Sequence, residues 1–343
     1  MTKILVVGDI HLRDRPPASC TEGYQDDILD MLSYVADLEK KYKADAVVWA
    51  GDVFDHKQPS KTPHKTVLRL IEVAKKYDNL WVIAGNHDLM QDRLDTLFDQ
   101  QPLGVLLESG AANFLDGWHP TLPLYGVSWQ QRWMNEGTAM DAFEMWRVDA
   151  RQMEGQTNQN KLVVTHCPLF PPGKEFELEY VPTSGPGSIA DAMGNAGYIY
   201  YGHIHDYHGT FVAGGVTYAN MGAISRGSLT EENMNREIKV AMWSDGSDLE
   251  VPPGGTSIPA GFKRGFTEIP VPHKPASEVF RVAEVMAERT EKLKLDEFLT
   301  QVSSTTLDIS SSASVISYVR EMDENVVTPR QKQLAIEIVE EIT

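Results

Sequence analysis

Short apolar runs alternate with amphipathic stretches from the first residues to about residue 220. The runs are rich in valine, isoleucine, tyrosine and tryptophan and are bounded by glycine, aspartate or asparagine, a pattern typical of buried strands. They lie at residues 4–7, 46–50, 80–84, 124–129, 162–165, 198–201 and 211–218. Because helical patterns separate the first three runs, we expect an α/β domain whose sheet is covered by helices.

Two helices are expected between these first three strands. Residues 26–43 carry an apolar stripe with helical spacing that begins at Ile28 and includes Leu32. The pair Thr62-Pro63 signals the start of a second helix. We interpret segments 104–118 and 130–160 as insertions, the second of them partly helical over 139–151.

A Pro/Gly-rich stretch at residues 251–261 predicts a domain boundary. We therefore divide the chain into a main domain, residues 1–262, and an accessory region, residues 263–343. The accessory region has one strand-like piece at 266–271 and a helical pattern over 277–294. A last helix is signalled by Thr328-Pro329 and extends to about Ile342. The region is therefore expected to be mainly helical.

Composition narrows the functional classes. No apolar run among the 343 residues approaches the roughly 18 that a membrane helix needs, and residues 1–9 do not resemble a signal peptide. Two cysteines exclude a disulfide framework, so we expect a cytoplasmic protein with no membrane partner. A net charge of −18 argues against coating nucleic acid unaided. It remains compatible with an enzyme that meets phosphates through bound metals.

Polar side chains follow five of the predicted strands, each at the point where its strand ends. They are Asp9 and His11 after the first strand, Asp52 after the second, Asn86 and His87 after the third, His166 after the fifth, and His203 and His205 after the sixth. Ligands bind at the carboxyl ends of strands in α/β sheets. We therefore expect these side chains to form one cluster.

The residue types in this cluster suit a pair of divalent metal ions. Imidazole, carboxylate and amide donors select manganese, iron or zinc over calcium. The carboxylate of Asp52 can bridge two ions about 3.5–4 Å apart, the separation typical of two-metal hydrolases. Such a pair supplies a bound hydroxide and stabilises charge on a phosphate. His87 can assist the leaving oxygen, or it can orient the neighbouring ligand instead.

Simpler interpretations apply to single residues. An isolated histidine at a strand end is more often a hydrogen-bonded structural residue than a ligand. Five such clusters in order, each after a predicted strand, favour a metal centre. Cys167 has no second base outside the cluster and is interpreted as a packing residue. The remaining histidines are expected to be surface or core residues: His56, His64, His119, His208 and His273.

The ordered motifs D-x-H, G-D, G-N-H-D, H and G-H-x-H, over roughly residues 3–225, resemble the calcineurin-like metallophosphoesterase superfamily. The resemblance implies an α/β four-layer sandwich of two mixed β-sheets flanked by helices, followed by a small, mainly helical capping domain. It also implies that His87 is catalytic and that Asp52 is shared by two metal sites. One site would be completed by Asp9, His11 and His205, and the other by Asn86, His166 and His203.

The stretch Gly51-Asp52-Val53-Phe54-Asp55, with D-I-H-L and H-I-H, resembles the SbcD-type DNA-repair nucleases and their phage recombination counterparts. That resemblance implies manganese, a homodimer and an SbcC-like SMC-family ATPase partner. The implied reactions are 3′-to-5′ exonuclease cleavage of duplex DNA and endonuclease cleavage of single strands. Asp55 departs from the pattern, because some members carry a histidine at that position.

Basic side chains follow the first two motifs, where the loops should reach the rim of the metal site. They are Arg13, Arg15, Lys57, Lys61 and Lys65, and they are candidates for DNA binding. Simple solvation of scattered charges is the alternative. Two further functions stay open: a phosphatase or phosphodiesterase for nucleotides or phosphoproteins, and an inactive metal-binding scaffold that organises an ATPase.

Overall fold

The computed structural model describes residues 1–90, 93–130, 161–171, 197–213, 215–246 and 264–282, and helical pieces at 287, 316–317, 319–320 and 329–342. The chain divides into two compact units, Met1–Phe280 and Arg281–Thr343. The first unit contains every strand of both sheets and is described first.

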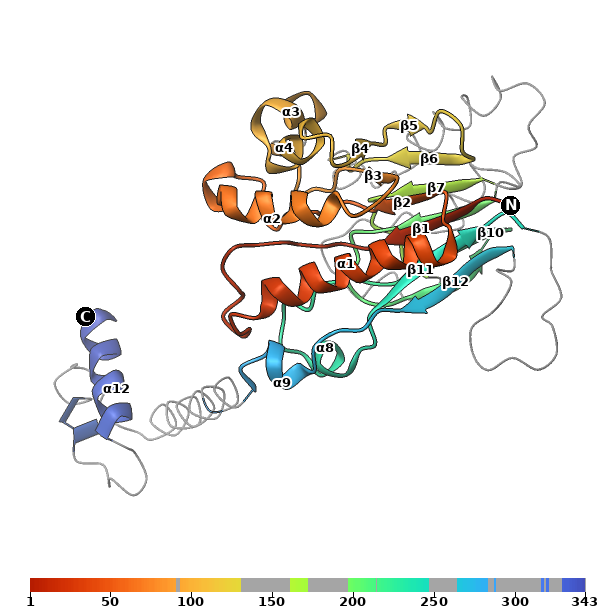
Figure 1. Cartoon of the computed structure of the whole chain (residues 1–343). Helices are drawn as coiled ribbons and strands as arrows, with labels where there is room; N and C mark the ends of the chain where they lie inside the picture. Colours follow the sequence, from red (N-terminus) through yellow and green to blue (C-terminus); the bar gives the residue numbers. More distant parts are fainter. Residues whose placement is uncertain are drawn as a thin grey trace. The chain divides into compact units, whose positions relative to one another are not determined.

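The first unit has two mixed sheets (Figure 1). One has the strand order β12-β11-β1-β2-β3-β4. Strands β1 to β4 are parallel, whereas β11 is antiparallel to both β1 and β12. The strands of this sheet are β1 (Lys3–Val7), β2 (Ala46–Trp49), β3 (Leu80–Val82), β4 (Asn113–Phe114), β11 (Lys239–Ser244) and β12 (Gly265–Pro270).

The second sheet has the order β5-β6-β7-β8-β10-β9. Its four central strands are parallel, and an antiparallel strand lies at each edge. They are β5 (Gly117–Trp118), β6 (Leu124–Val127), β7 (Leu162–Thr165), β8 (Tyr198–Tyr201), β9 (Gly209–Ala213) and β10 (Val216–Asn220). The expected fold class, two mixed sheets flanked by helices, is confirmed.

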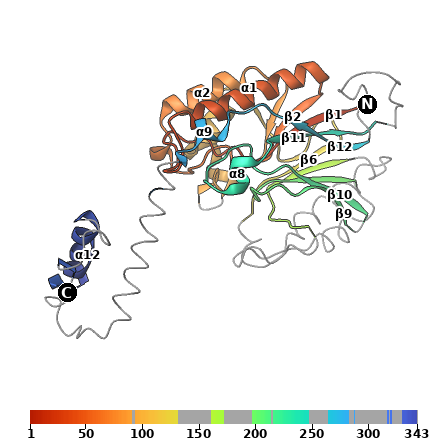
Figure 2. The ribbon, with the colours of Figure 1, turned by 90° about the horizontal axis from the view of Figure 1, so that it is seen from below.

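The two sheets pack face to face around one apolar core. Ile4 and Val6 of β1 share a cluster with Leu162 and Val164 of β7. Because side chains alternate along a strand, the other β1 residues point to the opposite face. Helices α1 (Tyr24–Tyr42) and α2 (His64–Ala74) lie on that side, as Figure 2 shows. Both helices were expected from the sequence, and their apolar stripes are buried.

The predicted strand at residues 211–218 is wrong, because this segment is a hairpin. Strands β9 and β10 pair antiparallel across it, from Val216 opposite Ala213 to Asn220 opposite Gly209. The chain turns at Gly215, which has a φ of +80°. Gly-Gly between two apolar runs is a hairpin signal, because the tight turn needs positive φ. The Gly-Gly pair in the sequence therefore indicates two strands here and not one.

Residues 104–118 are also not a simple insertion. They contain most of helix α4 (Pro102–Glu108), and then β4, which joins the first sheet, and β5, which joins the second. The segment is therefore the passage of the chain from one sheet to the other. The predicted insertion at 130–160 and its helix fall almost wholly outside the described residues.

Strand β11 was not expected from the sequence, although it lies between β1 and β12. Its Ala241 and Met242 have little strand preference, and burial rather than intrinsic preference favours them there. The strand-like piece at 266–271 forms β12 and pairs with β11 along its length. In the structure it therefore belongs to the first unit, although the predicted boundary at 262 precedes it. A capping role for residues 263–343 stays a proposal.

In the second unit, the expected final helix is present as α12 (Pro329–Ile342). The helix predicted from Ser277 begins in the first unit, with the short helix α9 (Ala276–Val279), whose last residue is followed by extended backbone at Phe280. The rest of that prediction lies mostly outside the described residues. Among the described helices, none combines the length and apolar character needed to cross a bilayer.

Candidate metal centre

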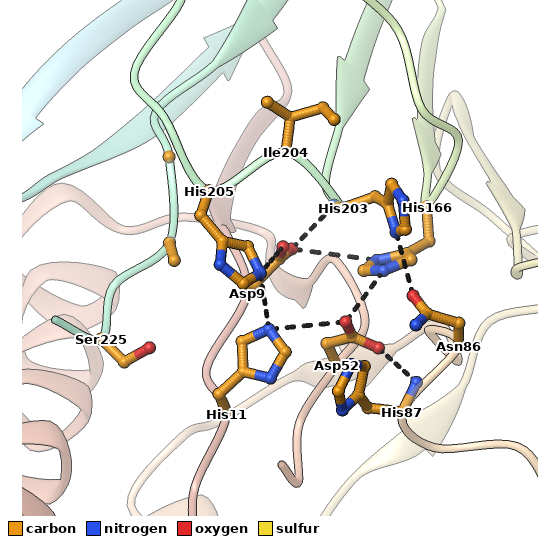
Figure 3. A network of polar contacts seen from close by, with 12 residues as sticks. Asp9, His11, Asp52, Asn86, His87, His166, His203, Ile204, His205 and Ser225 are labelled. Atoms are coloured by element: carbon orange, nitrogen blue, oxygen red, sulfur yellow. Dashed lines mark hydrogen bonds and ion pairs between the residues drawn. The ribbon is translucent and has the colours of Figure 1, made fainter. Parts of the chain in front are cut away.

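The candidate metal centre lies where the parallel strands of both sheets end (Figure 3). The seven predicted ligands and His87 all come from loops that directly follow β1, β2, β3, β7 or β8. Three of these residues have left-handed backbones: His11 (φ 47°), Asp52 (φ 45°) and His203 (φ 73°). Such backbones are uncommon outside glycine and cluster at functional sites.

Glycines beside the site allow the loops to approach one another. A Cβ on Gly85 would overlap the carboxylate and backbone nitrogen of Asp52. A Cβ on Gly202 would lie 2.6 Å from Asp9 Oδ1 and 2.9 Å from His166 Nδ1. The glycine of each motif is therefore required for space, because a methyl group there would displace a side chain of the centre.

One group of side chains comprises Asp9, His11, Asp52 and His205. Each offers a ligand atom, and these atoms all lie within 4.8 Å of one another. His11 Nε2 lies 2.8 Å from His205 Nε2 and 3.5 Å from Asp52 Oδ2. His205 Nε2 lies 3.5 Å from Asp9 Oδ2. These donor atoms converge as the ligands of one cation would.

A second group comprises Asp52, His166 and His203, with Asn86 beside it. His166 Nε2 lies 3.3 Å from Asp52 Oδ2, and His203 Nδ1 lies 2.9 Å from Asn86 Oδ1. The same oxygen, Asp52 Oδ2, therefore faces a histidine of each group. The other oxygen, Oδ1, accepts a hydrogen bond of 2.8 Å from the backbone N–H of His87. Asp52 would therefore belong to both sites if two cations were bound here.

Backbone carbonyls determine which nitrogen of two histidines points into the centre. His166 Nδ1 lies 2.7 Å from the carbonyl oxygen of Ala50, and His87 Nδ1 lies 2.7 Å from that of Asp55. A carbonyl oxygen only accepts, so Nδ1 must carry the proton in both rings. In the neutral rings Nε2 then has a free lone pair. His166 can use it to bind a metal, and in His87 it can take up a proton that the ring then donates to a substrate.

The carboxylates in the centre give it a strong preference for positive charge. Burial acts to lower the pKa of His166, but the charges of Asp52 and Asp9 outweigh it and raise that pKa to about 10. Burial acts to raise the pKa of Asp52, and the neighbouring histidines outweigh it and hold that pKa well below its usual range. The same carboxylates would stabilise a bound cation, and binding of that cation to His166 would displace its proton.

His203 and Asp88 respond to burial more directly. Burial lowers the pKa of His203 to about 3, and repulsion from His166 acts in the same direction. That imidazole is therefore neutral, as a metal ligand must be. Burial, followed by repulsion from Asp52, raises the pKa of Asp88 to about 6. Asp88 accepts backbone hydrogen bonds from Val53, Phe54 and Gly85, so it anchors the loops.

The residues present fit a pair of divalent cations. Asp9 Oδ2 and His166 Nε2 are buried and have no hydrogen-bond partner among the described residues. Unpaired buried polar atoms are costly, and a cation bound beside each of them would remove that cost. Imidazole, carboxylate and amide donors together match manganese, iron or zinc. The cluster therefore contains possible ligands for metal, and their role as ligands stays a proposal.

The five predicted DNA-binding residues do not all meet. Arg13, Arg15 and Lys61 line a hollow of about 450 Å³ together with His56 and Ser60. Lys57, which is half-buried, and Lys65, which is exposed, are not among the residues that line it. His56 was interpreted as an ordinary surface or core residue, and its position in this hollow was missed. Only its place directly after the second motif could have indicated it.

Asp55 lies between the hollow and the candidate metal centre. Its Oδ2 is 3.1 Å from an Arg13 guanidinium nitrogen and 3.4 Å from His56 Nε2, and its Oδ1 is 3.5 Å from His11 Nδ1. Burial acts to raise the pKa of Asp55, whereas His11 and Arg13 outweigh it and lower that pKa. The other sequence-based interpretations hold where the structure describes them: Cys167 is fully buried, and His119 accepts from two backbone N–H groups.

Among curated proteins, this chain is similar to the DNA double-strand break repair protein Mre11 of Aeropyrum pernix. The two are 35% identical over 101 residues, which cover 28% of this chain and 24% of the Aeropyrum protein. The matched stretch is thus about a quarter of that relative. Among solved structures, TT1561 of Thermus thermophilus gives a TM-score of 0.44 at 10% identity, covering 71% of this chain and 94% of that one.

A family-level match covers much more of the chain. The sequence profile of the calcineurin-like phosphoesterases matches residues 2–207, from the start of β1 to just beyond the H-x-H loop. Every loop of the candidate metal centre lies within this range. The chain therefore belongs to the calcineurin-like phosphoesterase family.

Proposed function

We propose that this chain is a two-metal-dependent DNA phosphodiesterase, the nuclease subunit of an SbcC–SbcD-like recombination and repair complex. Its proposed reactions are 3′-to-5′ exonuclease cleavage of duplex DNA and endonuclease cleavage of single strands. One observation carries the hydrolytic part: Asp52 Oδ2 faces both groups of possible metal ligands in a chain of the phosphoesterase family. The similarity to Mre11 over 101 residues supports DNA as the substrate.

The proposed ligands divide into two sets that share Asp52. Asp9, His11 and His205 would complete one site, in accordance with the first group of converging atoms. Asn86, His166 and His203 would complete the other. Manganese is the metal we propose, and iron and zinc accept the same donors. When bound, two such ions activate water at neutral pH and neutralise charge on the phosphate.

His87 is the proposed catalytic residue of the chain itself. Its backbone N–H donates to Asp52 Oδ1 and its Nδ1–H to the carbonyl of Asp55, so both the residue and its ring orientation are fixed. Nε2 is then the ring nitrogen available to the substrate. There a protonated ring can donate to the leaving 3′-oxygen of the cleaved phosphodiester.

The hollow lined by Arg13, Arg15 and Lys61 is the proposed contact for the DNA backbone. Guanidinium and ammonium groups at the rim of a metal centre can hold phosphates next to the one that is cleaved. The net charge of −18 limits how much of the duplex this chain can neutralise unaided. We therefore propose that a homodimer works with an SbcC-like ATPase partner, in the cytoplasm, and that residues 263–343 contact this partner.

The proposed function is tested with the purified full-length chain and end-labelled linear duplex DNA. With manganese, we expect 3′-labelled nucleotides to be released first and 5′-labelled strands to shorten progressively. Circular single-stranded DNA should be opened in the same buffer. EDTA should abolish both reactions. Hydrolysis of an aryl phosphodiester or a phosphoprotein, with neither DNA attacked, would contradict the DNA substrate and favour the phosphatase alternative.

We propose that DNA contacts both Lys61, which lines the hollow, and Lys57, which follows the lining residue His56 in the chain, so that reversing both charges should weaken DNA binding. In the Lys57→Glu/Lys61→Glu variant, we expect lower affinity for all sequences and a salt dependence reduced by about two in log–log slope, one for each lost phosphate contact. Hydrolysis of a small aryl phosphodiester should persist, since the ligand set is intact. Fluorescence anisotropy at several salt concentrations measures the affinity.

The matched control for this variant is Lys40→Glu/Lys41→Glu. These exposed lysines end α1, next to the amino end of β2, whereas the metal centre lies at its carboxyl end. The control makes the same change in net charge at the opposite edge of the sheet. Equal loss of affinity in both variants would indicate a general charge effect and would refute the proposed contact.

A further inference from the structure

Asp55 makes five contacts that join two loops of the candidate metal centre to the basic hollow. Its backbone N–H donates to the carbonyl of Leu12 (3.0 Å), and its own carbonyl accepts from His87 Nδ1 (2.7 Å). Its carboxylate faces His11 with one oxygen and Arg13 and His56 with the other. The side chain is only 18% exposed. A residue with these contacts connects the D-x-H loop, the G-D loop and the proposed catalytic histidine.

The contact with His11 concerns the orientation of a proposed ligand. His11 Nδ1 lies 3.5 Å from Asp55 Oδ1, while Nε2 on the other side of the ring faces Asp52 and His205. A carboxylate behind an imidazole favours a proton on the nearer nitrogen, which leaves the lone pair of the farther one free. Histidines that bind metals are commonly held in this way by carboxylates, which also increase their basicity.

The contacts with Arg13 and His56 hold the carboxylate itself. Arg13 lies 3.1 Å from Asp55 Oδ2 and also donates from Nε to the carbonyl of Arg15 (2.8 Å). The guanidinium is thus fixed between the carboxylate and the next turn of its own loop. Asp55 cannot rotate away from His11 without leaving Arg13, because the two oxygens of one carboxylate serve the two partners.

We propose that Asp55 is a positioning residue for the metal site that contains His11. Its carboxylate holds His11 with Nε2 towards that site, and Arg13 holds the carboxylate in turn. His11, Asp55 and His87 also offer ligand-type atoms within 4.8 Å of one another. In our proposal, Asp55 in this group supports His11 and does not itself bind a metal ion. The proposal rests on the proposed two-metal centre, and DNA cleavage does not enter its test.

The test is manganese binding to the full-length Asp55→Asn variant, measured by isothermal titration calorimetry after removal of metal with a chelator. The variant keeps the shape and the backbone carbonyl but loses the charge. We expect two manganese sites in the wild type. In the variant, one should be weakened about 10- to 100-fold, the usual effect of losing such a partner. The other should be unchanged, since His166 is held by Ala50 instead.

A second readout separates positioning from a loss of fold. At intermediate manganese concentrations, the Asp55→Asn variant should hold one manganese ion per chain instead of two. Its electron paramagnetic resonance spectrum should therefore show isolated rather than spin-coupled manganese. The melting temperature in EDTA should stay within a few degrees of the wild type. Asp45→Asn is the matched control, because Asp45 accepts from the backbone of Lys3 at the other edge of the sheet (2.8 Å). This control should bind manganese as the wild type does.

Arg13→Ala supplies a second variant. It should weaken the same manganese site to a smaller extent, and the effects of Arg13→Ala and Asp55→Asn should not add in the double variant, since the first acts through the second. Unchanged affinity at both sites in Asp55→Asn would overturn the proposal, as would equal weakening of both sites. A wild-type chain that binds manganese but cleaves no DNA would refute the proposed function and leave this inference standing. A wild type that binds no manganese would refute both.

Discussion

Asp52→Ala should abolish metal-dependent cleavage of DNA, with a loss on the order of 10³-fold or more. Asp52 Oδ2 lies 3.5 Å from His11 Nε2 and 3.3 Å from His166 Nε2, so the substitution removes the oxygen that both proposed sites share. Stabilisation of phosphate charge by two ions contributes several kcal/mol, and each ~1.4 kcal/mol corresponds to tenfold in rate. Release of nucleotides from labelled duplex DNA with manganese measures this loss.

Asp52→Asn distinguishes the charge of Asp52 from its place in the fold. The amide oxygen can still accept the backbone N–H of His87, which Asp52 Oδ1 accepts at 2.8 Å. We therefore expect the loops to keep their conformation, while bridging of two cations is lost. Asp45→Asn, at the amino end of the preceding strand, controls for the loss of a carboxylate. An Asp52→Asn chain that binds two manganese ions and cleaves DNA normally would refute the proposed mechanism.

His87→Ala should reduce DNA cleavage by about 10²- to 10⁴-fold, the usual contribution of a positioned acid or base. Manganese binding should be retained, because His87 Nδ1 is bonded to the carbonyl of Asp55 and the ring belongs to neither proposed ligand set. An alkoxide leaving group needs a proton more than a nitrophenolate does. Hydrolysis of a nitrophenyl phosphodiester should therefore fall much less than cleavage of DNA.

The comparison of the two substrates decides the role of His87. His273→Ala is the control, because His273 contacts a backbone carbonyl outside the candidate metal centre. Equal losses on DNA and on the nitrophenyl substrate would exclude proton donation to the leaving group. If His87→Ala loses a manganese ion, His87 would instead be a metal ligand or a residue that positions a metal ligand.

Much of the arrangement of the candidate metal centre could be predicted from sequence, because each strand and the polar residue that ends it are neighbours in the chain. Asp9 directly follows Val7-Gly8, and His203 follows Gly202, so local pattern alone indicated strand ends with ligand-type side chains. Parallel strands share an edge, and the seven side chains meet there. The family resemblance, and with it the two mixed sheets, was also readable from these motifs and is confirmed.

The misread segments have a common cause. Residues 211–218 form a hairpin, 104–118 pass from one sheet to the other, and 239–244 form a central strand. In each case the pairing partner decides the structure. In the hairpin that partner is the next run along the chain, marked by the Gly-Gly pair, whereas β4 and β11 pair with strands farther away in the sequence. Met242 is held in a strand by β1 and β12, from opposite ends of the first unit, rather than by its own preference.

The sequence by itself determined which kinds of atoms gather at this edge of the fold: imidazoles, carboxylates and an amide, each at a strand end because strand and motif are covalently adjacent. Only the tertiary structure decided which atoms face one another. Asp52 Oδ2 lies between His11 and His166, and Asp55 lies behind His11, because loops separated by many residues pack with these side-chain atoms 3.3 to 3.5 Å apart. Local pattern cannot encode those distances, since they depend on how two sheets and the glycines between them allow the loops to approach.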